Sequence, residues 1–145
     1  MVCMGGTSGH PYAETNIGND APAAALVCQS GLLKFAGTDA ITMRLLMPAS
    51  DIARISQTNT PATRAMIELI GLWRPSAPGK AGPVVFDAAP LIWLIEPRLI
   101  STIQMGLTVS EHGRTTFSST APRCGVSTDM ELLTFHRLIM DTLAR

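Results

Sequence analysis

The chain has 145 residues, 46% of them hydrophobic and 15% charged, with 11 Lys and Arg against 11 Asp and Glu. This size and composition predict one folded domain with a core of its own and exclude global disorder. Balanced charge and the lack of a basic run argue against nucleic-acid or anionic-membrane partners, and no apolar stretch approaches the roughly 18 residues of a membrane span.

The first third of the chain predicts a βαβ unit. Residues 1–4 form a short apolar strand, and Asp20 caps a helix over 20–29. Residues 32–36 predict the next strand, with residues 37–39 as the loop at its carboxyl end. A strand, a helix and a strand in this order are typical of a parallel α/β sheet.

The middle of the chain predicts two helices and a long break. The helices cover residues 48–57 and 60–73, and their apolar faces are interpreted as core packing. Residues 75–83 are rich in Pro and Gly and interrupt regular structure. We interpret this loop as a connector, with a mobile lid as the alternative.

The last part of the chain predicts a hairpin and a helix. Apolar residues alternate along a hairpin over 102–118, which turns at residues 112–113. Thr128 and Glu131 have the spacing of a capping box, so the final helix is predicted to begin there and to run to residue 143.

Three scattered cysteines, Cys3, Cys28 and Cys124, form no Cys-x-x-Cys pair. We interpret them as small buried hydrophobes rather than as a metal site or a disulfide framework. No signal peptide is visible, so a reducing, cytoplasmic location is expected.

Polar residues gather in the stretch 5–20, which joins the first strand to the first helix. In open α/β sheets, ligands bind beyond the carboxyl ends of the strands, which is where this stretch is expected. Glu14 and Asn16 are two residues apart on a segment predicted to be extended, so their side chains point the same way. A carboxylate and an amide side by side can bind the hydroxyls of a polyol.

Asp87 precedes a predicted helix over 88–95. Its local position favours an N-cap whose carboxylate accepts backbone N–H bonds, and the alternative is a ligand for a hard cation. His10 lies in the ligand-side loop and is a conceivable acid, although a solvated loop histidine is the commoner case.

These motifs together resemble the inosine/uridine-preferring nucleoside hydrolase family. The resemblance rests on Gly5-Gly6, Ala13-Glu14-Thr15-Asn16, the run from Asp20 to Ala24, Gly37-Thr38-Asp39, the run from Phe86 to Pro97, and Gly113-Arg114-Thr115. It implies an α/β fold with an open, mostly parallel sheet, flanking helices and a β-hairpin. Residues 1–145 are expected to form a single domain that corresponds to the C-terminal half of the family's domain and lacks its N-terminal strands.

The resemblance also implies an activity and a set of site residues. The family hydrolyses the N-glycosidic bond of ribonucleosides to ribose and free base with a Ca²⁺-activated water. By this resemblance Glu14, Asn16 and Ser8 bind the sugar of a ribonucleoside substrate, and Asp87 is a Ca²⁺ ligand. Ser8 stands where the family often has an asparagine.

Two departures from the family pattern predict impaired hydrolysis. No Asp-x-Asp-x-x-x-Asp-Asp motif is present to complete a metal site, and Phe86 stands where many members have a histidine acid. The alternative is a non-catalytic truncated paralogue or subunit that serves as a binding or structural piece. Because the first strand is expected to leave an open sheet edge, we also expect self-association into a homo-oligomer.

Overall fold

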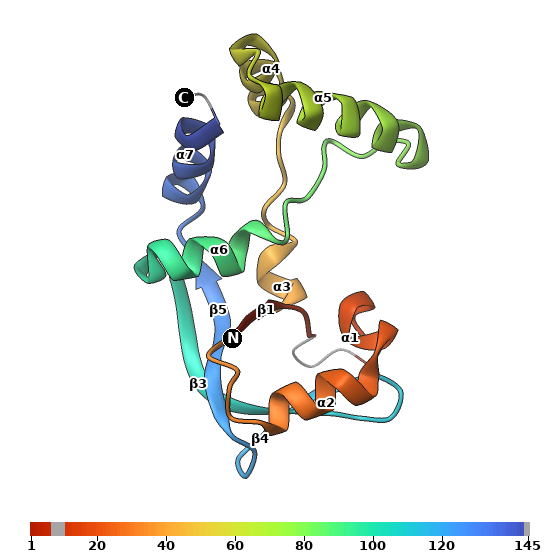
Figure 1. The fold of residues 1–145 in the computed structure, drawn as a ribbon, viewed down its shortest axis with the longest axis vertical. Coiled ribbons are helices and arrows are strands. Elements are labelled where there is room, and N and C mark those ends of the chain that lie inside the picture. The colour runs from red at the N-terminus through yellow and green to blue at the C-terminus, as the bar shows by residue number, and fades with distance from the viewer. Residues whose placement is uncertain (7–10, 144–145) are drawn as a thin grey trace.

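A computed structural model of the chain describes residues 1–6 and 11–143, which form a curled five-stranded sheet with helices around it (Figure 1). The strands are β1 (Val2–Met4), β2 (Phe35–Gly37), β3 (Ile100–Val109), β4 (Thr115–Ser118) and β5 (Arg123–Met130). The helices are α1 (Thr15–Asn19), α2 (Ala21–Gln29), α3 (Asp39–Thr42), α4 (Ala49–Thr58), α5 (Pro61–Trp73), α6 (Ala88–Ile95) and α7 (Leu132–Leu143), with short 3₁₀ turns η1 (Arg74–Ser76) and η2 (Pro97–Leu99).

The sheet has the strand order β1-β2-β5-β3-β4. β1 pairs in parallel with β2, and β2 with β5, whereas β3 runs antiparallel to both β5 and β4. The α/β class with flanking helices and the predicted hairpin of β3 and β4 are therefore confirmed. β1 and β2 place their carboxyl ends at the same edge of the sheet, as the βαβ prediction requires.

The prediction that a capping box at Thr128 starts the last helix is wrong. Residues 123–130 instead form β5, which pairs with β3 along its length, so that Ile100 lies opposite Met130. In this ladder the backbone N–H and C=O groups of β5 are hydrogen-bonded, whereas the first N–H groups of a helix would lack backbone partners. The strand therefore forms in place of the helix start that the local capping signal predicts. Glu131 caps α7 instead, because its Oε2 accepts the Thr134 backbone N–H at 2.8 Å.

Both faces of the sheet are buried at β2, where alternate residues of the strand point to opposite sides. On one face Phe35 is fully buried and stacks on Trp93 of α6, with ring centroids 5.0 Å apart. Phe135 of α7 belongs to the same cluster. On the other face Ala36 packs in a second cluster that includes Cys28 of α2. The order of layers is thus α6 and α7, then the sheet, then α2.

The cysteines confirm the prediction that they are small core residues. All three are free thiols in one cluster, with Cys28 and Cys124 buried and Cys3 half-buried. Burial, with a smaller contribution from the two neighbouring thiols, raises the pKa of Cys3 to about 12. These side chains are therefore protonated and unreactive at neutral pH.

The two central helices are confirmed within a residue or two of the predicted ends. Thr60 caps α5 through a reciprocal pair of bonds with Thr63, and Pro61 occupies the first turn. Ile55 of α4 and Ile70 of α5 are buried and pack with Met140 of α7. No helix within the described part of the chain is long and apolar enough to cross a membrane.

Candidate functional site

The chain leaves β1 through two glycines that make room for a carboxylate. Gly5 and Gly6 have φ angles of 152° and 95°, which side-chain-bearing residues rarely adopt. A Cβ atom on Gly5 would lie 3.0 Å from Oε2 of Glu14. The glycines therefore bring the backbone at the end of β1 against the side chain of Glu14.

Glu14 is the N-cap of α1, so the chain is helical from Thr15 onward. Its Oε1 accepts the Asn16 N–H at 2.9 Å, and its Oε2 accepts the N–H groups of Ile17 at 3.1 Å and Gly6 at 3.3 Å. The prediction that the segment through Asn16 is extended is wrong after Glu14, because this carboxylate satisfies the first N–H groups of α1. Three of its about four acceptor positions are used, which leaves one for a ligand.

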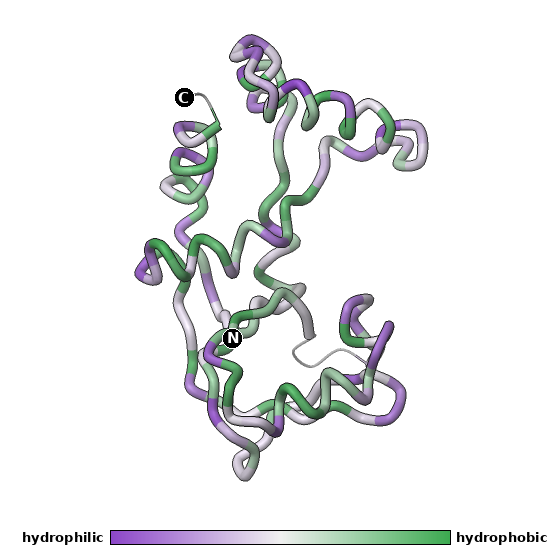
Figure 2. The backbone as a smooth tube through the Cα atoms, in the orientation of Figure 1, coloured by the Kyte–Doolittle hydropathy of each residue, from purple (hydrophilic) through white to green (hydrophobic). Residues whose placement is uncertain are grey.

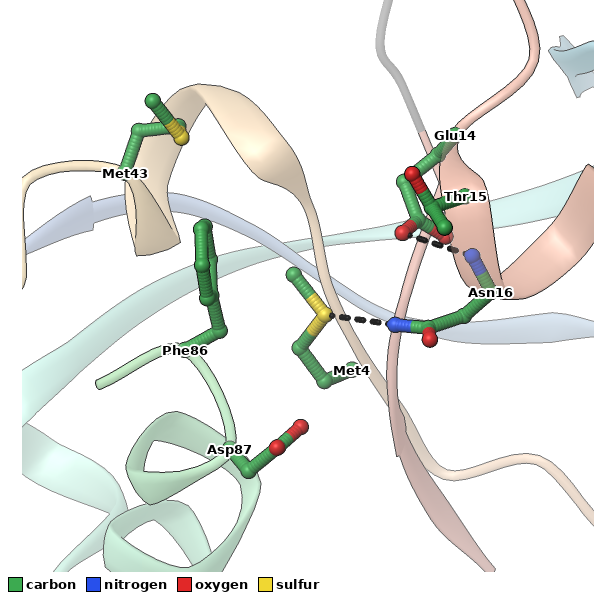
Figure 3. Close-up of a pocket in the computed structure, with 7 residues that line it drawn as sticks. All are labelled: Met4, Glu14, Thr15, Asn16, Met43, Phe86 and Asp87. Atoms are coloured by element: carbon green, nitrogen blue, oxygen red, sulfur yellow. Dashed lines mark hydrogen bonds between the residues drawn. The ribbon is translucent and has the colours of Figure 1, made fainter. Parts of the chain in front are cut away.

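Asn16 lies in the first turn of α1 with an exposed side chain. Its Nδ2 donates to the Sδ atom of Met4 at 3.2 Å (Figure 3). A thioether sulfur is a weak acceptor, so a hydroxyl oxygen is a better partner for this amide. The contact orients the amide toward the end of β1.

Asp87 stands at the start of α6, but its carboxylate does not cap the helix. Within the described residues its side chain makes no capping hydrogen bond, so the local N-cap interpretation is wrong for the side chain. The carboxylate points into the open space below Met4 and Asn16 (Figure 3).

These side chains line one cavity of about 390 Å³ at the carboxyl edge of the parallel strands. Its lining residues are Met4, Glu14, Thr15, Asn16, Met43, Phe86 and Asp87. The half-buried ring of Phe86 stands between Met43 and Met4 and forms the apolar side, opposite the polar groups of α1 (Figure 3). The structure therefore brings together Glu14, Asn16 and Asp87, whereas Ser8 and His10 lie outside the described residues.

Three lining residues were missed from the sequence. Met4 ends β1 directly before Gly5, so the rule that ligands bind beyond the ends of parallel strands is a signal that points to it. Thr15 lies between Glu14 and Asn16, two of the predicted sugar ligands. Met43 follows the short helix α3, and no sequence pattern marks it, because only the path of the chain brings it opposite Phe86.

The described residues do not fit a Ca²⁺ ion by themselves. Ca²⁺ takes six to eight oxygen ligands, several of them carboxylates. Among residues 1–6 and 11–143, no group of three or more His, Cys, Asp or Glu side chains is placed to hold a metal. The carboxylates in the described lining are Glu14, which is occupied by backbone N–H groups, and Asp87.

The sequence matches the family described as inosine-uridine preferring nucleoside hydrolase over residues 1–136. The chain belongs to this family. The match covers every described residue of the cavity and all but the last turns of α7.

Curated relatives in the family include two bacterial enzymes named pyrimidine-specific ribonucleoside hydrolase RihA. The one from Klebsiella pneumoniae is 32% identical over 125 residues, which are 80% of this chain and 40% of the relative. The one from Citrobacter koseri is 29% identical over 163 aligned positions, covering 99% of this chain and 52% of the relative. The chain thus spans about half the length of these relatives or less.

Solved structures of the family share the fold. A purine-preferring ribonucleoside hydrolase from Gardnerella vaginalis superposes with a TM-score of 0.82 and 18% identity over 98% of this chain and 49% of its own. A plant nucleoside hydrolase gives a TM-score of 0.83 with 16% identity over 98% of this chain and 51% of its own. At these identities the likeness concerns the fold alone, and again about half of the longer chain is covered.

Proposed function

We propose that this chain is a nucleoside hydrolase-like protein whose cavity binds the ribose of a ribonucleoside of the inosine or uridine type. One observation carries the proposal: Glu14 and Asn16 at the start of α1 and Asp87 directly before α6 line the same cavity. Family membership supports the choice of a nucleoside as the ligand.

The polar side of the cavity suits sugar hydroxyls. A hydroxyl group can replace Met4 as the acceptor for the Asn16 amide, and it can donate to the remaining lone pair of Glu14. Asp87 offers a second carboxylate across the cavity. By the family resemblance we propose that Ser8 adds a further hydroxyl contact.

The apolar side suits a base but not acid catalysis. Phe86 and Met43 present an aromatic face and a polarisable thioether, on which a nucleobase can stack. N-glycosidic cleavage passes through an oxocarbenium-like sugar and is helped by protonation of the leaving base. Phe86 has no proton to donate.

We therefore propose that hydrolysis by this chain alone is impaired. When bound, Ca²⁺ supplies an activated water to enzymes that use it. Asp87 is the proposed ligand for such an ion here, and a single available carboxylate predicts weak binding. The second candidate is a non-catalytic paralogue or subunit, which the missing acid at Phe86 and the incomplete ligand set favour.

The test is calorimetric titration of the purified chain with ribose and with Ca²⁺, together with hydrolysis assays on inosine and uridine. We expect ribose binding, weak Ca²⁺ binding and little turnover. Asn16→Ala should lower the ribose affinity about 5- to 10-fold, the equivalent of one hydrogen bond. Asn19→Ala, at the other end of α1 and outside the cavity lining, is the matched control and should bind as the wild type does.

Either of two results contradicts the proposal. Rapid Ca²⁺-dependent turnover would show that the chain builds a complete catalytic site. A folded sample that does not bind ribose would leave the non-catalytic subunit as the better description.

A further inference from the structure

We propose that the turn of the β3–β4 hairpin positions the polar wall of the cavity, with Gly113 as the positioning residue. The polar wall consists of Gly6 and residues 14–19, which include Glu14 and Asn16. Gly113 is not among the described lining residues of the cavity, so it acts through the wall and not on the sugar. The inference rests on the proposed function, which assigns the sugar to this wall.

The hairpin turn meets α1 at a glycine that has no room for a side chain. Gly113 has a φ angle of 77° and is buried, whereas His112 and Arg114 on either side are exposed. A Cβ atom on Gly113 would lie 2.8 Å from the Cα atom of Gly18 and 3.2 Å from its backbone N. The backbones of the turn and of α1 are therefore in direct contact.

The same hairpin also borders the glycines that follow β1. Thr115, the first residue of β4, is 3% exposed, and a Cβ atom on Gly6 would lie 3.5 Å from its Oγ1. The Gly6 N–H donates to Oε2 of Glu14 at 3.3 Å. The Gly18 N–H donates to the backbone oxygen of Glu14 at 2.7 Å. The hairpin thus contacts the two segments that hold Glu14 from either side.

The turn keeps its shape through its own hydrogen bonds. The Ser110 N–H donates to the Arg114 oxygen at 2.9 Å, and the Ser110 oxygen accepts the Gly113 N–H at 2.9 Å. Residues 110–114 carry no apolar side chain, and the turn is hydrophilic in Figure 2. Backbone geometry therefore sets how closely the turn approaches α1. β3, from which the turn extends, is paired on both edges, with β5 and β4.

The contact between the turn and α1 is close enough to control binding geometry. A Cβ atom on Gly113 would lie 2.8 Å from Gly18, and ordinary van der Waals contact begins at 3.4 Å, so the two backbones would separate by about 0.6 Å. Binding groups must lie within about 0.5 Å of their productive positions. α1 has only five residues, so a displacement at Gly18 also moves Asn16 and the Glu14 cap.

The first test compares Gly113→Ala with Gly79→Ala in calorimetric titration with ribose. Gly79 is the matched control, because its φ angle is 75° but no described atom lies within 4 Å of a Cβ atom built there. Both variants place a side chain at a positive φ, so both should have a lower unfolding midpoint than the wild type. Only Gly113→Ala should weaken ribose binding, by at least about 5-fold, as for one lost hydrogen bond.

Amide resonances in an NMR spectrum test the positioning without any ligand. The N–H groups of Gly6, Asn16 and Ile17 donate to the Glu14 carboxylate, so their chemical shifts report where it lies. Gly113→Ala should move these three resonances, and Gly79→Ala should leave them at the wild-type positions. If the resonances move but the wild-type chain does not bind ribose, the positioning role is supported and the proposed function is wrong.

Gly113→Asn separates the contact from the backbone strain. Asparagine adopts a positive φ more readily than alanine does, but it has a Cβ atom in the same place. This variant should therefore be more stable than Gly113→Ala and should bind ribose as weakly, and it serves as the test if the alanine variant does not fold. Wild-type ribose affinity in folded Gly113→Asn, or unmoved amide resonances, would overturn the proposal.

Discussion

At the scale of residues, two of the proposed sugar ligands, Glu14 and Asn16, have different structural roles. Glu14 is 5% exposed, and its carboxylate accepts hydrogen bonds from three backbone N–H groups. It therefore stabilises the turn after β1 and also lines the cavity. Asn16 is exposed and has Met4 as its hydrogen-bond acceptor. Substitutions at these positions should therefore separate folding from binding.

Glu14→Gln is expected to destabilise the chain by about 1–3 kcal/mol, because the new amide N–H₂ cannot accept the bonds that one carboxylate oxygen now accepts. Asn16→Ala should change stability by no more than about 0.5 kcal/mol, as is usual for an exposed side chain. Chemical denaturation of both variants measures the difference. Equal stability of the two would show that the buried bonds of Glu14 do not hold the turn.

At the scale of elements, the start of α7 depends on one carboxylate. Hydrogen bonds with the Thr134 side chain and then with its backbone N–H lower the pKa of Glu131 below its ordinary value. A lowered pKa means that the folded state binds this proton less tightly than the unfolded state does. The stabilisation is thus fully present above the unfolded pKa and is lost as the pH falls through the folded pKa.

Glu131→Gln is expected to lower the thermal unfolding midpoint at pH 7, where the wild-type carboxylate is charged and accepts the N–H groups of α7. The gap between variant and wild type should close as the pH falls below 4.5, the ordinary pKa of glutamate. Glu68→Gln, on the exposed side of α5, is the control and should show no such gap. A gap that is independent of pH would exclude the charged cap as its cause.

At the scale of the whole molecule, Phe35 joins the sheet to the helical layer. It is fully buried on β2, between β1 and β5, and it stacks on Trp93 of α6. β2 has only three residues, so side-chain packing rather than strand length holds the centre of the sheet. Loss of this ring should affect every layer at once.

Phe35→Ala is expected to cost about 3–5 kcal/mol through the cavity that it leaves. This is a large part of the about 5–15 kcal/mol that stabilises a typical domain, so much of the chain should be unfolded at 37 °C. Phe117→Ala on β4, where the ring is 47% exposed, should cost much less. Circular dichroism during heating distinguishes the two, and similar melting curves would contradict the central role of Phe35.

The sequence by itself determined the features that local chemistry controls. Asp20 caps α2 as predicted, and α5 begins beside Thr60 as predicted, because in each case a side-chain oxygen accepts the backbone N–H three residues further along. The resemblance to the family predicted Glu14, Asn16 and Asp87 as site residues, and all three line the cavity. Their roles in binding stay predictions.

The tertiary structure alone decided the rest. β5 became the central strand because its pairing partners on β2 and β3 lie 17 to 90 residues away, and their ladders outweigh the local capping signal at Thr128. Met43 lines the cavity only because of the path that the chain takes after β2. The side of α6 that is exposed is set by the packing that buries Ala89 and Ile92 on the opposite side. Local pattern specifies elements, whereas pairing and packing between distant residues specify which surfaces meet and which remain open.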